Sequence, residues 1–354
     1  MTDSTFARRA GIVVGLVAAT VLGLLFIGTA LQVLLLLVAG VLLAVFFRGL
    51  GSWLSRHTPL SEGWGVLVAV VGIVAMLVGI GWLLAPRISA QWAQLSSQLP
   101  NSLGQLRQQL QQYRLGRALM EQEPSLSELK DKLMNSRGEW VRRSLGVAST
   151  TLGILADGYL ILFISAFMAA QPAPYRQGII LLIPKAHRER AREVLNQLGR
   201  TLFRWLLGKL FSMLVVAVLT ALGLWLLSMP LALTLALFAG LFSFIPNFGP
   251  LIGLVPALLL AFTQGPTKAL YVVLLYLAVQ LVESNLITPL VQRRMVALPP
   301  ALVILSQVVL GVFTGSLGLI LATPIVAMLL VLVKMLYIHD VLDDPQPEAA
   351  MSSN

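Results

Sequence analysis

Long apolar runs, separated by short polar and basic stretches, dominate the pattern of this 354-residue chain. A helix needs roughly 20 apolar residues to cross a hydrocarbon core about 30 Å thick, and several of these runs approach or exceed that length. The pattern therefore predicts an all-α, polytopic membrane protein. The candidate spans are Ala10–Gly28, Leu31–Phe47, Trp64–Ala85, Gly146–Ala170, Leu206–Leu227, Leu231–Phe262, Leu270–Val291 and Ala301–Leu336.

Composition supports this class, because 57% hydrophobic residues, 11% charged residues and a mean hydropathy of +0.86 do not describe a soluble surface. At the start of the chain, Arg8 and Arg9 precede an apolar run in the manner of a signal peptide. That run continues to Phe47 with only Thr29 and Gln32 as polar interruptions, which favours a helical hairpin instead.

The net charge of +10 raises the possibility of a nucleic-acid partner. Basic residues in short loops of membrane proteins stay on the cytoplasmic side, and this accounts for the charge, so we expect lipid around the chain and no nucleic acid. The largest basic cluster follows Ala170 and marks a cytoplasmic loop: Arg176, Lys185, Arg188, Arg190, Arg192, Arg200 and Arg204. Counting spans from it predicts a bacterial inner (cytoplasmic) membrane protein with both termini in the cytoplasm.

The same count of spans places the segment from Arg87 to Arg143 outside the membrane. This segment differs from the rest of the chain in being rich in Gln, Ser and charged residues. Leucines from Leu95 to Leu110 recur every three or four residues, and Leu126, Leu129 and Leu133 form a second stripe, so the segment predicts amphipathic helices. A Leu-rich insert of this size more often packs against itself or a neighbouring subunit than binds a substrate. The basic stretch that begins at Arg188 is interpreted as an interfacial helix with Val194, Leu195, Leu198 and Leu202 towards lipid.

These features divide the chain into five regions. They are N-terminal membrane helices (1–86), an extracytoplasmic helical insert (87–145), a membrane helix with a basic cytoplasmic interfacial helix (146–205), a C-terminal transport core (206–336) and an acidic cytoplasmic tail expected to be disordered (337–354).

The stretch SFIPNFGPLIGLVP interrupts the apolar run Leu231–Phe262 with helix-breaking residues. Its three prolines remove amide donors, and its glycines permit turns and close approach. The alternative is an ordinary proline kink. As one helix the run would extend about 48 Å, against a core of about 30 Å, which favours two half-helices split near Asn247. In lipid such a break persists only against protein or water.

The last apolar segment, Ala301–Leu336, has the same excess length, and GVFTGSLG lies near its middle. If both segments are re-entrant, Arg293 and Arg294 fall in the cytoplasm and the two hairpins face each other from opposite sides of the membrane. This is the inverted arrangement of secondary transporters that bind solute near the bilayer midplane.

Between these segments lies Glu283, an acid in apolar sequence and therefore a functional candidate. On a helix it shares a face with Tyr276 and Gln280. Burial favours the protonated form unless a cation or a hydrogen-bond donor holds the carboxylate ionised. The alternative role is structural pairing with a neighbouring span or subunit, with Lys209 as one such partner.

Enzyme chemistry has little support in this sequence. It has no cysteine, its three histidines lie outside the candidate spans, and it has no HExxH, GxSxG or GxxxxGK[ST] motif. We expect no enzyme, no catalytic residue, no metal site and no cofactor, with a proton or sodium as the coupling ion.

The motifs IP-x-x-GP, E-x-N-x-x-x-P, LPP and G-x-x-G-x-x-x-A-x-P follow one another from Ile245 to Pro324. In the identity and order of these motifs, the chain resembles the AI-2E family, which is also called the autoinducer-2 exporter or PerM-like family of transporters. The resemblance implies a homo-oligomer, with pentamers reported for the family. It also implies export of the furanosyl signal or sodium/proton antiport. Lys209 departs from the family pattern, in which glutamine is common.

The sequence thus predicts an ion-coupled exporter of a small hydrophilic solute, with Glu283 as the coupling candidate. A passive channel and a non-transporting scaffold remain the alternatives. The predicted solute and ion path comprises Pro246, Asn247, Gly249, Pro250, Gly253, Pro256, Gln280, Glu283, Asn285, Pro289, Thr314, Gly315, Gly318 and Pro324.

Overall fold

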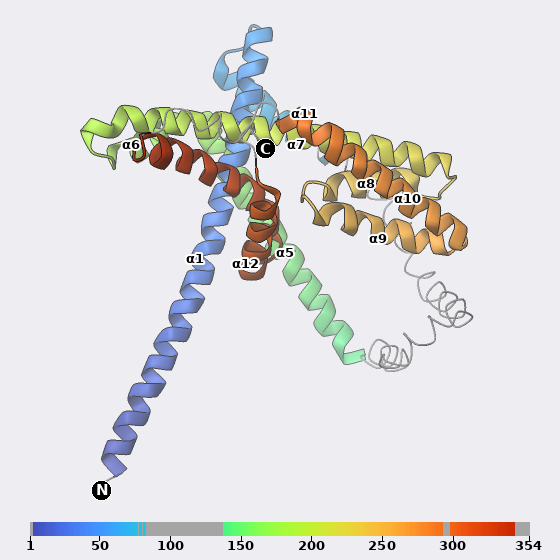
Figure 1. The fold of residues 1–354 in the computed structure, drawn as a ribbon. Helices are drawn as coiled ribbons and strands as arrows, with labels where there is room; N and C mark the ends of the chain where they lie inside the picture. The colour runs from blue at the N-terminus through green and yellow to red at the C-terminus, as the bar shows by residue number, and fades with distance from the viewer. Residues whose placement is uncertain (1–2, 77, 80, 83–136, 293–297, 344–354) are drawn as a thin grey trace. The chain divides into compact units, whose positions relative to one another are not determined.

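The computed structural model describes residues 3–76, 78–79, 81–82, 137–292 and 298–343, and within them the chain is helical with no strand (Figure 1). An unlabelled helix covers Glu62–Met76. The labelled helices are α1 (Asp3–His57), α5 (Arg137–Ala170), α6 (Pro172–Leu181), η1 (Lys185–His187), α7 (Arg188–Leu226), α8 (Ala232–Phe242), α9 (Phe248–Phe262), α10 (Pro266–Val282), η2 (Glu283–Ile287), α11 (Thr288–Gln292), α12 (Pro300–Leu332) and η3 (Val333–His339).

The helices form two compact units. Unit 1 comprises residues 1–53, 160–204 and 296–354, and unit 2 comprises residues 54–159 and 205–295. Because the boundaries fall inside helices, α1, α5 and α7 each contribute to both units.

Unit 1 is held by close helix contacts around α1. A Cβ at Gly40 would lie 2.6 Å from Cγ2 of Ile164, so the glycine lets α5 approach the α1 backbone. Phe46 of α1 packs against Phe203 of α7 with ring centroids 6.4 Å apart. The Arg48 guanidinium donates to the carbonyl of Ala169, in the last turn of α5, at 3.4 Å.

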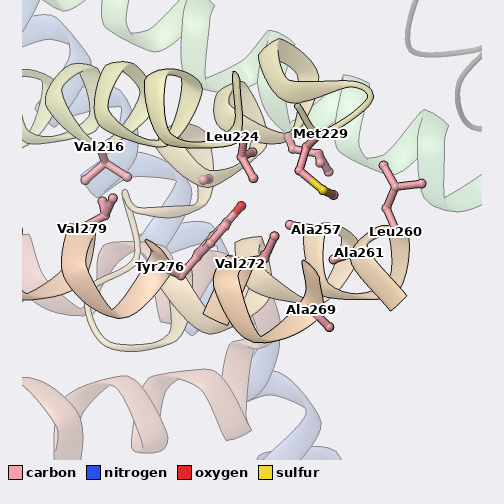
Figure 2. Packing of buried hydrophobic residues seen from close by; sticks show 12 residues of the cluster. Val216, Leu224, Met229, Ala257, Leu260, Ala261, Ala269, Val272, Tyr276 and Val279 are labelled. Carbon is pink, nitrogen blue, oxygen red and sulfur yellow. The ribbon is translucent and has the colours of Figure 1, made fainter. Parts of the chain in front are cut away.

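Unit 2 packs the second half of α7 with α8, α9 and α10 around one apolar cluster (Figure 2). Many of its buried residues are small, such as Ala239, Ala257, Ala261 and Ala269. Small side chains let apolar helices approach closely, and this contact takes the place of the hydrophobic driving force that is absent between helices in lipid. Figure 2 shows Val216 of α7 opposite Val279 of α10.

The predicted break near Asn247 is confirmed. α8 ends at Phe242, α9 starts at Phe248, and the two helices pack against each other as a hairpin. A Cβ at Gly249 would overlap the carbonyl of Phe242, so only glycine permits this close return of the chain. The arms hold 11 and 15 residues, about 16 and 22 Å, which is too short for either to cross the membrane.

A second break lies in α12, at Gly315, whose φ of 67° and ψ of −143° are not helical. A Cβ at Gly318 would overlap the carbonyl of Leu310, although eight residues along a straight helix would separate the two by about 12 Å. The chain therefore doubles back at the predicted GVFTGSLG stretch. That either hairpin is re-entrant, or that the two face each other, stays a prediction.

Among the described residues, four helices are long and apolar enough to span a membrane: Ala30–His57, Lys185–Leu226, Pro266–Leu290 and Pro300–His339. The pair Leu155–Ala170 and Pro172–Leu181, bent by 86° where Gln171 and Pro172 interrupt the helix, would make a fifth. The prediction of an all-α membrane protein is therefore confirmed at this level.

Two expectations are wrong. The predicted N-terminal hairpin is absent, because α1 continues without a break from Asp3 to His57: Thr29 and Gln32 both fit a helix, and no proline interrupts this stretch. The basic stretch is continuous with α7, and Val194 and Leu202 are buried within the protein instead of facing lipid. The expected outer helices, whose leucine stripes run from Leu95 to Leu133, lie outside the described residues, as do Arg293 and Arg294.

Candidate functional site

Glu283 lies at the end of α10 in unit 2, and its residue is only 8% exposed. Tyr276 and Val279, on the same helix face, are buried as well, whereas Gln280 is half-buried. The spacing of three and four residues thus carries the carboxylate into the packed side of an otherwise apolar helix, as the sequence predicts for Tyr276 and Glu283.

Two side chains of α7 contact this carboxylate. The Ser212 hydroxyl donates to Oε1 of Glu283 at 2.8 Å, and Nζ of Lys209 lies 3.4 Å from the same oxygen. Lys209 and Ser212 are three residues apart, so they project from the same face of α7. Lys209 was one structural partner predicted for Glu283, and it lies beside the carboxylate in the structure. Ser212 was not predicted, although its i, i+3 spacing from Lys209 was a signal.

The two contacts differ in strength. A charge-assisted N–H···O bond is usually about 2.7–2.9 Å long, so the Lys209–Glu283 distance of 3.4 Å describes a loose ion pair. The side chains of Lys209 and Glu283 are 12% and 10% exposed. Separating two charges that are so poorly hydrated is costly, because neither regains the full hydration that it has in water.

The contacts between α7 and α10 run antiparallel along a seam. Ser212 meets Glu283, Val216 lies opposite Val279, and a Cβ at Gly223 would overlap the Leu275 side chain. On this stretch of α7, Oγ1 of Thr220 is buried and has no hydrogen-bond partner among the described residues. Thr220 was not predicted either, and nothing in its local sequence marks it.

The helix turn that carries Glu283 is wider than an α-turn. In η2 the Thr288 amide donates to the Glu283 carbonyl, five residues back. Pro289 follows directly, and its ring would clash with the carbonyl four residues earlier in a regular α-helix. The widened turn accommodates that proline. Such π-turns are frequent at functional sites.

The break between α8 and α9 is a strained turn. Asn247 has φ 67° and ψ −48°, and the Phe248 amide donates to the Pro246 carbonyl at 2.8 Å. These values describe a γ-turn with positive φ, a rare conformation for a residue with a side chain. The ring of Phe244 meets Trp205 of α7 edge-on at 5.8 Å, which ties the break to the helix that carries Lys209.

The residues of the predicted path in unit 2 fall into two groups. Gly249 and Gly253 are buried where α9 meets α8, and the Tyr276 hydroxyl donates to the Gly253 carbonyl at 3.2 Å. Asn285 is exposed, and its side-chain amide donates to the Leu281 carbonyl of its own helix at 3.0 Å. Asn247 and Pro289 are exposed, and Pro246, Pro250 and Pro256 are half-buried.

The remaining predicted residues belong to unit 1. The Thr314 hydroxyl donates to the Leu310 carbonyl at 2.6 Å, Gly315 is exposed at the turn, and Gly318 and Pro324 are buried. In both units, therefore, the predicted glycines and prolines shape the breaks, while the charged chemistry gathers at Glu283.

The described residues hold no group of three or more His, Asp or Glu side chains that could bind a metal ion. The Lys209–Ser212–Glu283 cluster brings together a carboxylate, an ammonium and a hydroxyl, which between them offer hydrogen-bond donors and acceptors.

Comparison with known proteins gives one family. The model described as "AI-2E family transporter" matches residues 14–338. "Putative transport protein YueF" of Bacillus subtilis (strain 168) is 25% identical over 300 residues, which cover 82% of this chain and 80% of that protein.

Two further relatives match shorter parts. "Putative transport protein YrrI" of the same organism is 26% identical, over 59% of each chain. "Putative transport protein MT0215" of Mycobacterium tuberculosis (strain CDC 1551 / Oshkosh) is 27% identical, over 56% of this chain and 54% of that protein.

Proposed function

Because this chain belongs to the AI-2E family of transporters, we propose that it is an ion-coupled secondary transporter that exports a small hydrophilic solute, with Glu283 as the coupling residue. The family supports membrane transport in general; the direction, the solute and the coupling are our proposal. By family resemblance the solute is an autoinducer-2-like signal.

The buried cluster at Glu283 carries this proposal. A carboxylate among apolar helices is costly to maintain, and it is held here by an ammonium at 3.4 Å and a hydroxyl at 2.8 Å. Helices that only had to pack would do so with apolar residues at least as well. A titratable group on a π-turn, in contact with a second helix, is suited to linking ion binding to helix movement.

The broken helices supply the second part of the proposal. The α8–α9 turn and the turn at Gly315 interrupt apolar helices, and breaks of this kind are tolerated in a membrane where they line protein or water. We assign the solute path to these breaks, with Asn247 and Thr314 as polar partners of the solute.

A sodium/proton antiporter uses the same cluster with no organic solute, and it is the second candidate function. The alternatives from other classes are a passive channel, whose flux ignores ion gradients, and a scaffold, which tolerates loss of Glu283 and Asn247.

The decisive test measures flux of an autoinducer-2 furanosyl signal in proteoliposomes under imposed proton and sodium gradients. Glu283→Gln keeps the size and removes the titration, so gradient-driven flux should be abolished while exchange without a gradient survives. Glu283→Gln also leaves the buried Lys209 ammonium without an ionised partner, which can lower the stability of the variant. Oligomer size and thermal stability are therefore measured on the same preparations.

Glu193→Gln is the matched control, because Glu193 is an exposed glutamate near the start of α7 and its loss should leave flux unchanged. Asn247→Ala should weaken solute flux under every gradient. Unchanged proton and sodium dependence in Glu283→Gln would assign Glu283 a structural role.

Assembly is a separate part of the proposal. We propose a homo-oligomer, with a pentamer as the expected form, in which the outer insert supports subunit contact. Deleting residues 98–132 should reduce the mass of the particle in detergent, and an unchanged oligomer would remove this role from the insert.

A further inference from the structure

Both partners of Glu283 bind one of its two carboxylate oxygens. Ser212 donates to Oε1, Lys209 lies beside Oε1, and no donor to Oε2 is recorded among the described residues. The position next to the carboxylate where a coupling cation would sit is thus already held on one side by the ammonium of the protein's own lysine.

We propose that Lys209 is the resident counter-ion of Glu283, so that the pair binds protons and excludes sodium. This inference rests on the proposed function, because it names the coupling ion of the same site, and it argues against the sodium/proton antiporter at this cluster. It makes Lys209 the residue that determines ion specificity.

Two features of the cluster disfavour sodium. A metal cation beside Glu283 would be repelled by the ammonium, and this repulsion is strong where both side chains are about nine-tenths buried. A hard cation also needs several oxygen ligands. The recorded side-chain oxygens at this site are those of Glu283 and Ser212, and the third member of the cluster carries only N–H donors.

A proton meets neither obstacle, because it forms an O–H bond on the carboxylate and needs no further ligands. The pair then changes from net charge zero to +1. The ammonium loses an ionised partner, and since it has only donors, its contact with the neutral acid weakens. The Ser212 hydroxyl can donate to the carboxylate or accept from the acid, so it holds Glu283 in both states. Protonation therefore frees Lys209 from α10, and release of the proton restores the pair.

Few other titratable side chains occur on the described helices around this pair, and on α7 the preceding one is Arg204, five residues before Lys209. On α10 the preceding titratable side chain is Tyr276, whose hydroxyl donates to the Gly253 carbonyl. Lys268, at the start of α10, donates to the Leu227 carbonyl at the end of α7. The sequences of α8, α9 and α11 contain no titratable side chain.

Binding of radioactive sodium to the purified full-length protein in detergent tests the inference at about pH 8, where an ordinary carboxyl is ionised. The wild-type protein and Lys209→Arg, which keeps the cation, should show no saturable binding. Lys209→Gln replaces the ammonium by an amide, which removes the Coulomb repulsion and supplies a further oxygen ligand. This variant should show saturable sodium binding, at least about tenfold tighter than any binding by the wild type. The double variant Lys209→Gln/Glu283→Gln has no charge left and should lose that binding.

Saturable, Glu283-dependent sodium binding by the wild-type protein would overturn the inference, as would a folded Lys209→Gln variant that binds no sodium. If Lys209→Gln does not fold, wild-type protein and Lys209→Arg decide: no saturable binding in both supports the inference, and Glu283-dependent binding in either overturns it.

Failure of this inference and failure of the proposed function would give different experimental results. Sodium-driven solute flux in wild-type proteoliposomes would overturn the counter-ion role and leave the transporter intact. Absence of flux under every gradient, together with the predicted binding pattern, would overturn coupled transport and leave the counter-ion role standing.

Discussion

Two clusters of charged side chains in this protein have similar chemistry but differ in their exposure to solvent. In unit 1 the Arg190 guanidinium meets both carboxylate oxygens of Asp340, at 2.9 and 3.0 Å, and Glu193 at 2.7 Å, and it also donates to the Met335 carbonyl at 3.1 Å. In unit 2 Lys209 and Glu283 approach only to 3.4 Å.

By geometry the Arg190 cluster is the better one, because a bidentate arginine–carboxylate contact has ideal directions and lengths. It is nevertheless partly exposed, with the side chains of Arg190 and Asp340 at 28% and 32% exposure. Water and salt screen such pairs, and their net contribution to stability is small.

The Lys209–Glu283 pair is the reverse: loose in geometry but buried in apolar surroundings, where loss of one partner leaves the other charge uncompensated. Surroundings, more than bond length, therefore decide which cluster the fold depends on. The same argument suits the Arg190 cluster to tying the start of α7 to the end of η3, and it is consistent with the coupling role that we propose for the Glu283 cluster.

The largest effect is expected for Lys209→Met, which leaves the Glu283 carboxylate buried without its cation. We expect a loss of about 3–5 kcal/mol in the free energy of unfolding, measured in detergent at neutral pH. The double variant Lys209→Gln/Glu283→Gln should recover most of that loss. Equal losses in the two variants would show that the pair is not the cause.

A smaller effect is expected for Ser212→Ala, which removes the hydroxyl that donates to Glu283 at 2.8 Å. Hydrogen bonds to charged groups contribute about 1.5–3 kcal/mol, and the unfolding measurement should show a loss in this range. Ser306→Ala is the control, since the bond recorded for that hydroxyl within the described part of the chain goes to the Val303 carbonyl of its own helix. If both variants behave alike, the Ser212 contact is unimportant.

The smallest effect is expected for Asp340→Asn in the exposed cluster. The hydrogen bond from Arg190 lowers the pKa of the Asp340 carboxyl. A lowered pKa in the folded state stabilises the fold at pH values above the unfolded carboxyl pKa of about 3.9, and this contribution is lost as the pH falls through the folded-state pKa.

Melting temperatures from neutral to acid pH check this prediction. The wild-type protein should melt slightly above Asp340→Asn at neutral pH, and the difference should vanish in acid and shrink in high salt. A difference that persists in acid would contradict the role of the ion pair. Salt should change the Lys209→Met effect far less, because buried charges are poorly screened.

Local sequence was sufficient for several features of the site. Proline and glycine marked the breaks at Asn247 and Gly315, because their backbone chemistry acts at the residue itself. Glu283 stood out because an acid among apolar residues is rare. Ser212 did not, because its i, i+3 spacing from Lys209 becomes informative only once it is known which helix packs against α10, and the order of apolar residues along α7 does not contain that information.

The sequence by itself determined the all-helical membrane class, the positions of the breaks and the presence of an acid, Glu283, in apolar sequence, since apolar length, backbone chemistry and residue type are local properties. Only the tertiary structure decided that α1 is one continuous helix, that Val194 and Leu202 are buried, and that Lys209 and Ser212 share one oxygen of Glu283. These facts depend on which helix faces meet. Many faces of an apolar helix are chemically alike, so that choice follows from the packing of small side chains and from the few buried polar groups that need a partner.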